Sequence, residues 1–177
     1  YFEHVMASFD IPAIRNSTFT IGYDAMYGAG YLIFPRILPK ATCLHCDYNP
    51  SFYGQAPEPI ERNLKPFAEM IKADPNMQIG IANDGDADRI GMFDGDGNFV
   101  DSHHILLLLL LYLHKYEGMT GKVVITFSVT DKMVQMAQKF GLEVEVTRIG
   151  FRYIAKIMTR EDVLFGGEES GGLAVKG

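Results

Sequence analysis

The stretch "MQIGIANDGDADR", Met77 to Arg89, joins a strand-like run to a cluster of acids. Three aspartates, Asp84, Asp86 and Asp88, alternate with small residues and stop at Arg89. Negative charges this close repel one another, so a folded chain needs a reason to keep them together. The cluster begins where the predicted strand ends, and ligands gather at that end of the strands in open α/β folds. The stretch therefore predicts a sheet strand that leads into a ligand site.

Strand-like and helix-like segments alternate along the rest of the chain. Strands are predicted over residues 19–26, 40–46, 77–84, 121–128, 142–148 and 162–167, with a hairpin over 90–100 and a last strand over 172–177. Helices are predicted over residues 1–14, 28–38, 58–73, 102–116, 131–141 and 151–158. This order predicts the α/β class, with two consecutive α/β units, each a mostly parallel mixed sheet flanked by helices. The pattern restarts near residue 102, which places the units at 1–102 and 103–177.

The composition is that of a globular protein. The chain has 177 residues, of which 47% are hydrophobic and 21% charged, and its net charge is −6. It has no Lys/Arg-rich run, so nothing favours a nucleic-acid surface. The apolar run Ile105 to Leu113 is too short for a membrane span, which takes about 20 residues, and predicts a helix buried on most of its faces. With no signal peptide at the start of this sequence, we expect a cytoplasmic protein that binds neither nucleic acid nor membrane.

Cys43 and Cys46 form a C-x-x-C pair in "ATCLHCDYNP". A zinc site would need four ligands, and only His45 and Asp47 are near in the sequence. A redox pair usually lies where a strand turns into a helix, whereas this context indicates a strand that runs into a loop. We therefore expect two reduced cysteines of a cytosolic protein.

The spacing of Asp84, Asp86 and Asp88 can turn three carboxylates toward one point in a loop. Converging carboxylates are stable with a cation among them, which indicates a hard-metal site for Mg²⁺ or Ca²⁺. An EF-hand is excluded, because the loop lacks its glycine at the sixth position and its glutamate at the twelfth. Arg89, next to such a metal, is well placed to hold a phosphate. The alternative is a solvated acidic turn without metal, which gives Arg89 no role.

A second pair of acids, Asp94 and Asp96, lies in "MFDGDGNF". The motif resembles the D-x-D-G-T of haloacid-dehalogenase-type phosphatases, in which Asp94 would be the nucleophile and Asp96 the acid/base. Asn98 replaces the threonine, and the motif lies in the middle of the chain rather than on a first strand. A solvated hairpin turn explains this pair without any function. The phosphatase is the runner-up enzyme hypothesis.

The glycine-rich loop "FGGEESGG", Phe165 to Gly172, carries Glu168 and Ser170. A carboxylate and a hydroxyl presented together suit vicinal sugar hydroxyls, and flanking glycines let the backbone approach a ligand closely. A hairpin with solvent-facing glutamates is equally consistent with this loop. In "TRIGFRYI", Arg148 and Arg152 could both reach phosphate oxygens. Two surface arginines without a ligand are the more common outcome for such a pair.

Together these motifs resemble those of the α-D-phosphohexomutase superfamily, the phosphoglucomutase/phosphomannomutase group. "DGDADR" (84–89) is similar to its metal-binding loop and "GEESGG" (167–172) to its sugar-binding loop. "GFRYI" (150–154) resembles its G-F-K-Y-I segment. "YDAMYGAG" (23–30) and "NPSFYGQAPEP" (49–59) resemble two further stretches of that family. The resemblance covers nearly the whole chain in the family's order.

The resemblance implies that residues 1–102 are the second of four domains. Residues 103–177 would be most of the third domain, C-terminally truncated. The first domain, with its phosphoserine in a T-A-S-H-N-P type motif, and the phosphate-binding fourth domain are missing from this sequence. The chain is therefore expected to be a central fragment. Its expected partners are a hexose phosphate substrate and domains 1 and 4 of the same chain.

The implied reaction interconverts hexose 1-phosphate and hexose 6-phosphate of glucose or mannose through a phosphoserine and a bisphosphate intermediate. The resemblance makes the three aspartates of the 84–89 loop ligands of Mg²⁺ and gives Arg89 a contact with the phosphoryl group. It assigns Glu168 and Ser170 to sugar hydroxyls, and Arg148 and Arg152 to phosphate. The isolated fragment is expected to be inactive, because the phosphoserine is missing.

Two positions, Arg152 and Tyr27, depart from the family pattern, and Glu169 bears on the branch within the family. Arg152 replaces the usual lysine; a guanidinium stays protonated, so it can hold phosphate but is a poor proton donor or acceptor. Tyr27 replaces a common histidine, with no predicted consequence. Glu169, in place of glutamine, points away from the phosphoglucosamine branch. Outside the enzyme class, the alternative is a non-catalytic sugar-phosphate-binding module, which agrees with the missing serine motif.

Overall fold

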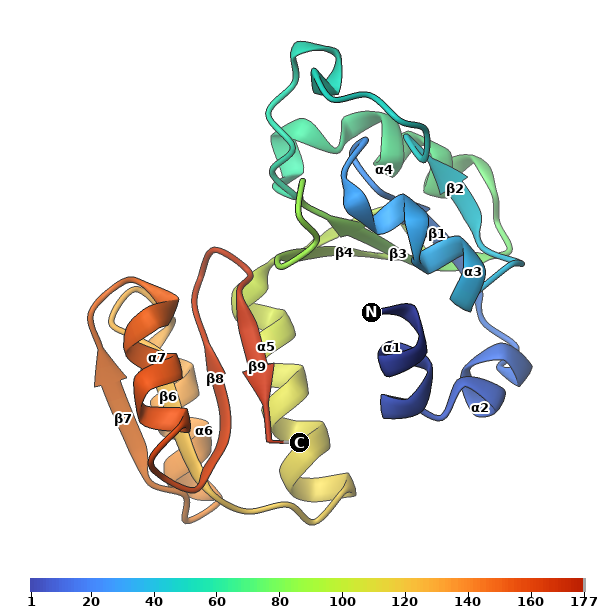
Figure 1. Ribbon diagram of the computed structural model, residues 1–177. Coiled ribbons are helices and arrows are strands. Elements are labelled where there is room, and N and C mark those ends of the chain that lie inside the picture. The colour runs from blue at the N-terminus through green and yellow to red at the C-terminus, as the bar shows by residue number, and fades with distance from the viewer. Residues whose placement is uncertain (177) are drawn as a thin grey trace. The chain divides into compact units, whose positions relative to one another are not determined.

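The chain divides into two compact units, Tyr1–Val100 and a second one that begins at Asp101. The structure is a computed structural model that describes residues 1–176, so Gly177, the last residue of the predicted 103–177 unit, lies outside the described residues. Each unit consists of a mixed, mostly parallel sheet with helices packed on it (Figure 1). The predicted fold class is confirmed.

The first unit is built on a five-stranded sheet in the order β2-β1-β3-β4-β5. Its strands are β1 (Thr20–Asp24), β2 (Thr42–Leu44), β3 (Met77–Asn83), β4 (Ile90–Asp94) and β5 (Phe99–Val100). Its helices are α1 (Phe2–Ser8), α2 (Ile11–Asn16), α3 (Phe34–Ile37) and α4 (Lys65–Ala73), with the 3₁₀ turns η1 (Ala29–Leu32), η2 (Phe52–Gly54) and η3 (Glu61–Asn63). Strands β1, β2 and β3 are parallel, whereas β4 and β5 run antiparallel to their neighbours. The carboxyl ends of the three parallel strands therefore meet at one edge.

Helix α4 packs on a part of this sheet where two neighbouring strands both have a glycine. Gly22 of β1 and Gly80 of β3 are cross-strand partners. A Cβ atom at Gly80 would lie 2.3 Å from Cδ1 of Ile71 on α4. On the other face of the sheet, Tyr23 stacks on Phe34 of α3 with 3.8 Å between ring centroids. The two glycines thus let α4 approach the backbone of β1 and β3 directly.

The second unit is built on a four-stranded sheet in the order β7-β6-β8-β9, in which only β9 is antiparallel to its neighbour. Its strands are β6 (Lys122–Thr126), β7 (Val144–Thr147), β8 (Val163–Gly167) and β9 (Leu173–Val175). Its helices are α5 (Ser102–Leu111), the π-helical turn η4 (Tyr112–Tyr116), α6 (Asp131–Lys139) and α7 (Phe151–Met158).

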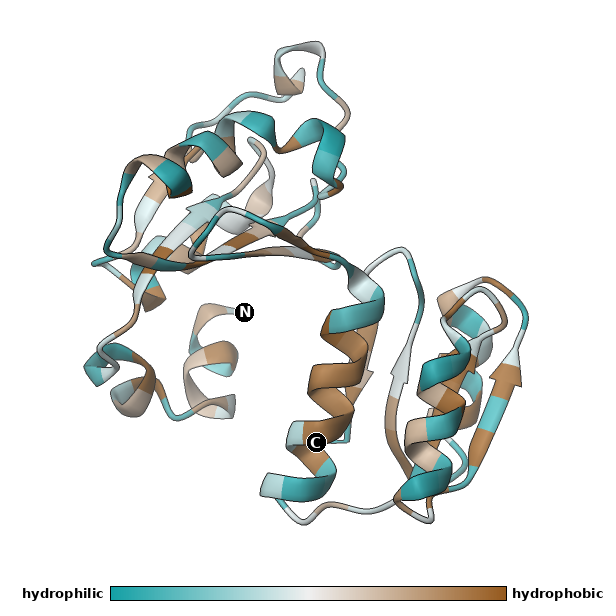
Figure 2. Cartoon of the chain, turned by 180° about the vertical axis from the view of Figure 1, so that it is seen from behind, coloured by the Kyte–Doolittle hydropathy of each residue, from teal (hydrophilic) through white to brown (hydrophobic). Residues whose placement is uncertain are grey.

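Successive side chains of β6 point to opposite faces of the sheet and so contribute to two separate hydrophobic clusters of the second unit. Val123 and Ile125 join a cluster with residues of α5 and α6, whereas Val124 packs with Ile154 of α7. Helix α5 is hydrophobic along nearly its whole length (Figure 2). It is buried on fewer faces than expected, because Leu108 keeps 57% of its surface exposed. Among residues 1–176, no helix is long and apolar enough to cross a membrane.

Three predicted helices are shorter than the patterns indicated. The helix expected over 1–14 breaks in two, because the Asp10 side chain accepts a hydrogen bond from the Ala13 amide and caps a new helix, α2. The helix expected over 58–73 begins only at Lys65, with a proline in its first turn, where the missing amide costs nothing. The helix expected over 28–38 is a 3₁₀ turn followed by the single turn of α3.

Candidate functional site

The three aspartates of the acidic loop converge. The loop leaves the carboxyl end of β3 and returns as β4. One carboxylate oxygen from each of Asp84, Asp86 and Asp88 lies within 4.8 Å of the other two. Asp84 is buried, with 1% of its surface exposed, whereas Asp86 and Asp88 are exposed. Three hard oxygen donors facing one point from a loop fit a divalent cation of the Mg²⁺ or Ca²⁺ kind.

Electrostatic repulsion acts within this trio. The pKa of the Asp88 carboxyl is raised, first by its partial withdrawal from water and then by the charges of Asp84 and Asp86. A positive charge between the carboxylates would relieve that repulsion.

Asp84 also organises the loop. Its Oδ1 accepts hydrogen bonds from the backbone amides of Asp88 (2.9 Å) and Arg89 (3.0 Å), and its Oδ2 accepts one from Nε of Arg89 (2.6 Å). Burial raises the pKa of Asp84, but the hydrogen bonds and the charge of Arg89 outweigh burial, so that its pKa lies below the ordinary value. The guanidinium of Arg89 is thus held by Nε, and its side chain remains 34% exposed.

A neighbouring segment supports the acidic loop. The amide of Ala29 donates to the carbonyl oxygen of Gly85 at 2.9 Å. A Cβ atom on Gly28 would lie 2.7 Å from the carbonyl oxygens of both Asp84 and Gly85. Only a glycine permits this approach, which accounts for a glycine in the "YGAG" segment. Ala87 has φ 63°, a left-handed conformation that is uncommon for alanine and that tightens the turn between the acids.

The sequence did not reveal a hydrogen-bonded pair, a buried aspartate and a histidine, beside this loop. Asp24, at the end of β1, is 1% exposed, and its two carboxylate oxygens lie 3.0 and 3.1 Å from Nδ1 of His45. Burial raises the pKa of Asp24, while the Met26 amide and His45 act in the opposite direction. The pair forms because β1 and β2 are parallel neighbours, so that the residues after both strands meet. No spacing rule connects two residues 21 positions apart.

Asp94 holds a turn. It accepts hydrogen bonds from the amides of Asp96 (3.0 Å) and Asn98 (2.8 Å) and from the Asn98 side chain (3.0 Å). These bonds, led by those from Asn98, lower the pKa of Asp94. The carboxylate of Asp94, the nucleophile of the phosphatase hypothesis, is therefore occupied by hydrogen bonds that hold the β4–β5 turn. One of the donors is Asn98, the residue that replaces the threonine of the phosphatase motif.

The glycine-rich loop of the second unit joins β8 to β9. The amide of Glu168 donates to the carbonyl oxygen of Gly172 at 2.9 Å and closes the turn. Glu168 is only 7% exposed, and its Oε1 accepts a hydrogen bond from the Gly150 amide at 2.6 Å. Gly150 precedes α7 with φ 121°, a backbone conformation that L side chains rarely adopt. Glu168 therefore ties the loop to the start of α7, while Ser170 is exposed.

Glu169 bonds to the carboxyl end of β6. Its Oε2 accepts hydrogen bonds from the hydroxyls of Thr126 (3.2 Å) and Ser128, and its carbonyl oxygen accepts one from Ser102. Burial raises the pKa of Glu169, but the hydrogen bonds led by Ser128 lower it below the ordinary value. The two adjacent glutamates thus hold the loop to different elements of the unit.

The two predicted phosphate-binding arginines converge on a tyrosine that the sequence did not single out. Nη2 of Arg152 donates to the Tyr153 hydroxyl at 3.1 Å. The pKa of Tyr153 is lowered by Arg152 first and, less strongly, by Arg148. Arg148 and Tyr153 line a groove of about 520 Å³ between β7 and α7, which Lys156 and Arg160 also border. Both arginines are exposed and keep free donors for an anion.

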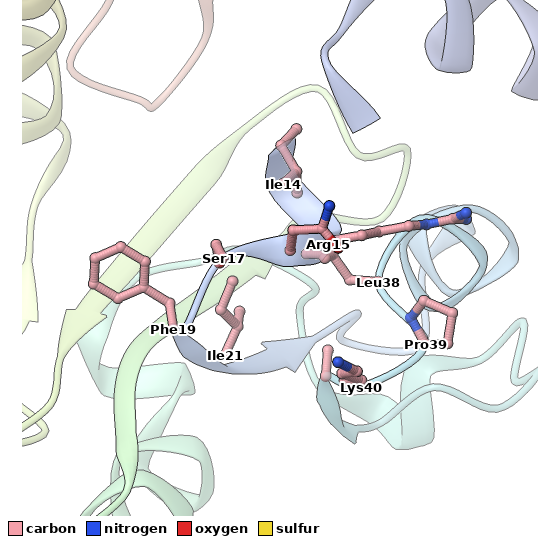
Figure 3. Close-up of a pocket in the computed structure, with 10 residues that line it drawn as sticks. Ile14, Arg15, Ser17, Phe19, Ile21, Leu38, Pro39 and Lys40 are labelled. Carbon is pink, nitrogen blue, oxygen red and sulfur yellow. The ribbon is translucent and has the colours of Figure 1, made fainter. Parts of the chain in front are cut away.

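Another pocket, of about 370 Å³, lies at the opposite end of the first sheet (Figure 3). It is lined by the segments that precede β1 and β2, with Phe19, Leu38 and Lys40 among the lining residues. The Arg15 guanidinium beside it donates to the carbonyl oxygens of Arg36 (2.7 Å) and Ile37 (2.8 Å). None of the residues that the sequence analysis selected as site candidates lines this pocket. Arg15 stabilises the fold here, because it hydrogen-bonds the backbone at the end of α3.

Two domain profiles of one family match the chain. The one described as phosphoglucomutase/phosphomannomutase, alpha/beta/alpha domain II, matches residues 1–97. The one described as domain III of the same family matches residues 101–177.

Relatives by sequence and by structure carry related names. A phosphoglucosamine mutase of Methanococcus maripaludis is 32% identical over 97% of this chain, and a phosphoglucomutase/phosphomannomutase of Thermococcus kodakarensis is 30% identical over 98% of it. The chain spans 39% and 38% of their lengths. Relatives of both names are similar to this chain to about the same degree, so their names do not choose between the two branches.

A crystal structure of a protein provisionally named a phosphomannomutase, from Thermus thermophilus, superposes with a TM-score of 0.88 at 31% identity, over 99% of this chain and 41% of that one. Aspergillus fumigatus N-acetylphosphoglucosamine mutase, in complex with GlcNAc-6P and magnesium, has the same fold at 16% identity, with a TM-score of 0.68 over 99% of this chain and 40% of that one. The chain belongs to the phosphoglucomutase/phosphomannomutase family of the α-D-phosphohexomutase superfamily, and it carries that family's domains II and III.

Proposed function

We propose that this chain supplies the metal-binding and sugar-binding segments of a phosphohexomutase. The whole protein would interconvert hexose 1-phosphate and hexose 6-phosphate through a phosphoserine and a bisphosphate intermediate. Glucose and mannose phosphates are the proposed substrates, and the names of the relatives add glucosamine phosphate to the panel. The observation that carries the proposal is the convergence of three carboxylates at the end of β3 in a chain that belongs to this family.

Asp84, Asp86 and Asp88 would hold Mg²⁺, since their oxygens suit a hard cation. When bound, the ion would supply positive charge that offsets the negative charge of a transferring phosphoryl group. Arg89 is fixed through Nε, and its remaining N–H donors would contact that phosphoryl group.

The second unit would bind the sugar phosphate. Ser170, exposed on the β8–β9 loop, would contact a sugar hydroxyl together with Oε2 of Glu168. Oε1 of Glu168 is already bonded to the Gly150 amide, so the carboxylate is held in place before any ligand arrives. Arg148 and Arg152 would hold phosphate by charge, because a guanidinium neither gives nor takes a proton at ordinary pH.

A metal titration tests the first part. Calorimetry of this 177-residue chain with Mg²⁺ should give weak binding, because three carboxylates leave the ion well hydrated. Asp86→Asn should weaken binding about tenfold, because it removes one of three charged ligands, whereas Asp96→Asn, an exposed acid outside the trio, should leave it unchanged. Tight Mg²⁺ binding that survives Asp86→Asn would contradict the proposed site.

A substrate panel tests the second part. The full-length protein should isomerise at least one of glucose, mannose and glucosamine 1-phosphate in the presence of Mg²⁺. The 177-residue chain alone should be inactive, since it lacks a phosphoserine motif of the family's type. Turnover by this chain alone would refute the assigned roles. Sugar-phosphate binding without turnover by the full-length protein would favour the non-catalytic module instead.

A further inference from the structure

The loop between β8 and β9 is a tight turn. The amide of Gly171 donates to the carbonyl oxygen of Glu168 at 3.2 Å, so that Glu169 and Ser170 are the two central residues of a β-turn. In such a turn the peptide between the central residues can take two orientations, which distinguish type I from type II. Type II needs a positive φ at the second central residue, and Ser170 has none. The peptide that joins Glu169 to Ser170 is therefore held in one of these two orientations.

A hydroxyl from another element holds this central peptide. The side chain of Ser102 donates a hydrogen bond to the carbonyl oxygen of Glu169, which is the carbonyl of that peptide. Ser102 is partly buried and is the first residue of α5. The start of α5 does not need this hydroxyl, because Asp101 is the N-cap and accepts a hydrogen bond from the His104 amide at 2.9 Å. The Ser102 hydroxyl is thus available to the turn.

The carboxylate of Glu169 holds the turn at a second point. Its Oε2 accepts hydrogen bonds from the hydroxyls of Thr126 and Ser128, at the carboxyl end of β6. Glu169 is therefore fixed both through its carboxylate and through its carbonyl oxygen, whereas Ser170 is exposed. These contacts hold the backbone beneath Ser170 and leave Ser170 itself open to a ligand.

We propose that Ser102 is a positioning residue for sugar recognition: its hydroxyl fixes the central peptide of the β8–β9 turn, and with it the direction in which Ser170 points. Ser102 acts through Ser170, so the inference rests on the proposed role of Ser170 at a sugar hydroxyl. Without the Ser102 hydroxyl the peptide can rotate, and fewer molecules present Ser170 in the binding orientation. The apparent affinity for the sugar then falls in proportion to that fraction.

Steady-state kinetics of the full-length protein, with the most active sugar phosphate of the substrate panel, test this role. Ser102→Ala should raise KM about fivefold and leave kcat within about twofold, because one ordinary hydrogen bond is lost and the reacting groups are unchanged. Ser102→Thr, which keeps a hydroxyl, should keep KM within about twofold of wild type. The matched control is Thr159→Ala, which removes a bond of the same kind, from a hydroxyl to a backbone carbonyl, at an exposed position after α7. It should leave both constants unchanged.

A measurement without ligand follows the turn directly. The amide of Ser170 belongs to the central peptide, so its NMR signal reports the orientation of that peptide. In spectra of the 177-residue chain, Ser102→Ala should shift or broaden the amide signals of Ser170 and Gly171 more than those of α6, and Thr159→Ala should not. A spectrum in which the whole second unit has unfolded would assign the hydroxyl to folding instead and would overturn the proposal.

The kinetic outcomes separate this inference from the proposed function. If the wild-type protein is active and Ser102→Ala leaves KM unchanged, the inference is wrong and the proposed function stands. An equal rise in KM for Ser102→Ala and Ser102→Thr would show that the hydroxyl is not the cause, with the same consequence. A wild-type protein that turns over no sugar phosphate of the panel would refute the proposed function, and the inference with it.

Discussion

Replacing Asp84 by asparagine should destabilise the first unit without any metal present. The substitution keeps an acceptor for the two backbone amides but removes the charge that Arg89 contacts through Nε at 2.6 Å. A hydrogen bond between charged groups contributes about 1.5–3 kcal/mol. Because 34% of the Arg89 side chain is exposed, water replaces part of that interaction. We expect a loss of about 2 kcal/mol, which at a urea dependence of about 2 kcal/mol per molar lowers the unfolding midpoint by about 1 M.

The measurement is urea unfolding at pH 7 with EDTA, followed through amide NMR signals of each unit. The second unit should keep its midpoint and serves as an internal reference. Asp86→Asn is the matched control, because it makes the same chemical change at an exposed carboxylate of the same loop and should alter stability by less than about 0.5 kcal/mol. Equal effects of the two substitutions, or an equal shift of the second unit, would refute the structural role of Asp84.

Three other contacts can be tested in the same way. The pKa of Glu169 is lower in the folded chain than in the unfolded chain, where it is about 4.3, so the ionised carboxylate stabilises the second unit at pH values above about 4.3. This stabilisation is lost as the pH falls through the folded pKa. Glu169→Gln should therefore reduce the difference between the urea midpoints of the second unit at pH 7 and at pH 3. Gly28→Ala should cost the first unit about 2 kcal/mol by forcing apart two backbone segments, whereas Gly172→Ala, with 3.5 Å to its nearest atom, should cost less than about 1 kcal/mol in the same assay. His45→Ala should cost the first unit about 1–3 kcal/mol, because the buried Asp24 carboxylate then keeps only its hydrogen bond from the Met26 amide. His104→Ala, which breaks an exposed contact with Asp101, should cost the second unit less than about 1 kcal/mol in the same urea assay.

Local patterns in the sequence were sufficient for much of the fold. Helix α7 spans Phe151–Met158 as predicted, because its apolar positions recur at helical spacing and a glycine precedes it. Helix α6, predicted over 131–141, spans Asp131–Lys139, because Thr130 caps its first turn and Gly141, with φ 70°, follows its end. The patterns failed over residues 28–38 and 58–64, where the chain forms single turns too short to have a period.

The site was predictable only where its residues are neighbours in the sequence. The i, i+2, i+4 spacing indicated that three carboxylates converge, but not that Asp84 is buried while the other two are exposed. The partners of Glu169, Thr126 and Ser128, lie 43 and 41 residues away and are reached through the parallel pairing of β6 with β8. Such contacts depend on sheet order, which one sequence does not contain. The ligand roles of the aspartates, Glu168, Ser170 and the arginines remain predictions.

The glycine pair beneath α4 limits how this family member can vary. Gly22 and Gly80 face each other across β1 and β3, and the space where their side chains would stand is filled by Phe67, Ile71 and Met77. A methyl group added at Gly80 would lie 2.3 Å from the terminal methyl of Ile71 and 3.1 Å from the Phe67 ring, so the Ile71 side chain would have to move or become smaller. A smaller residue at position 71, valine or alanine, should therefore reduce the cost of an alanine at position 80.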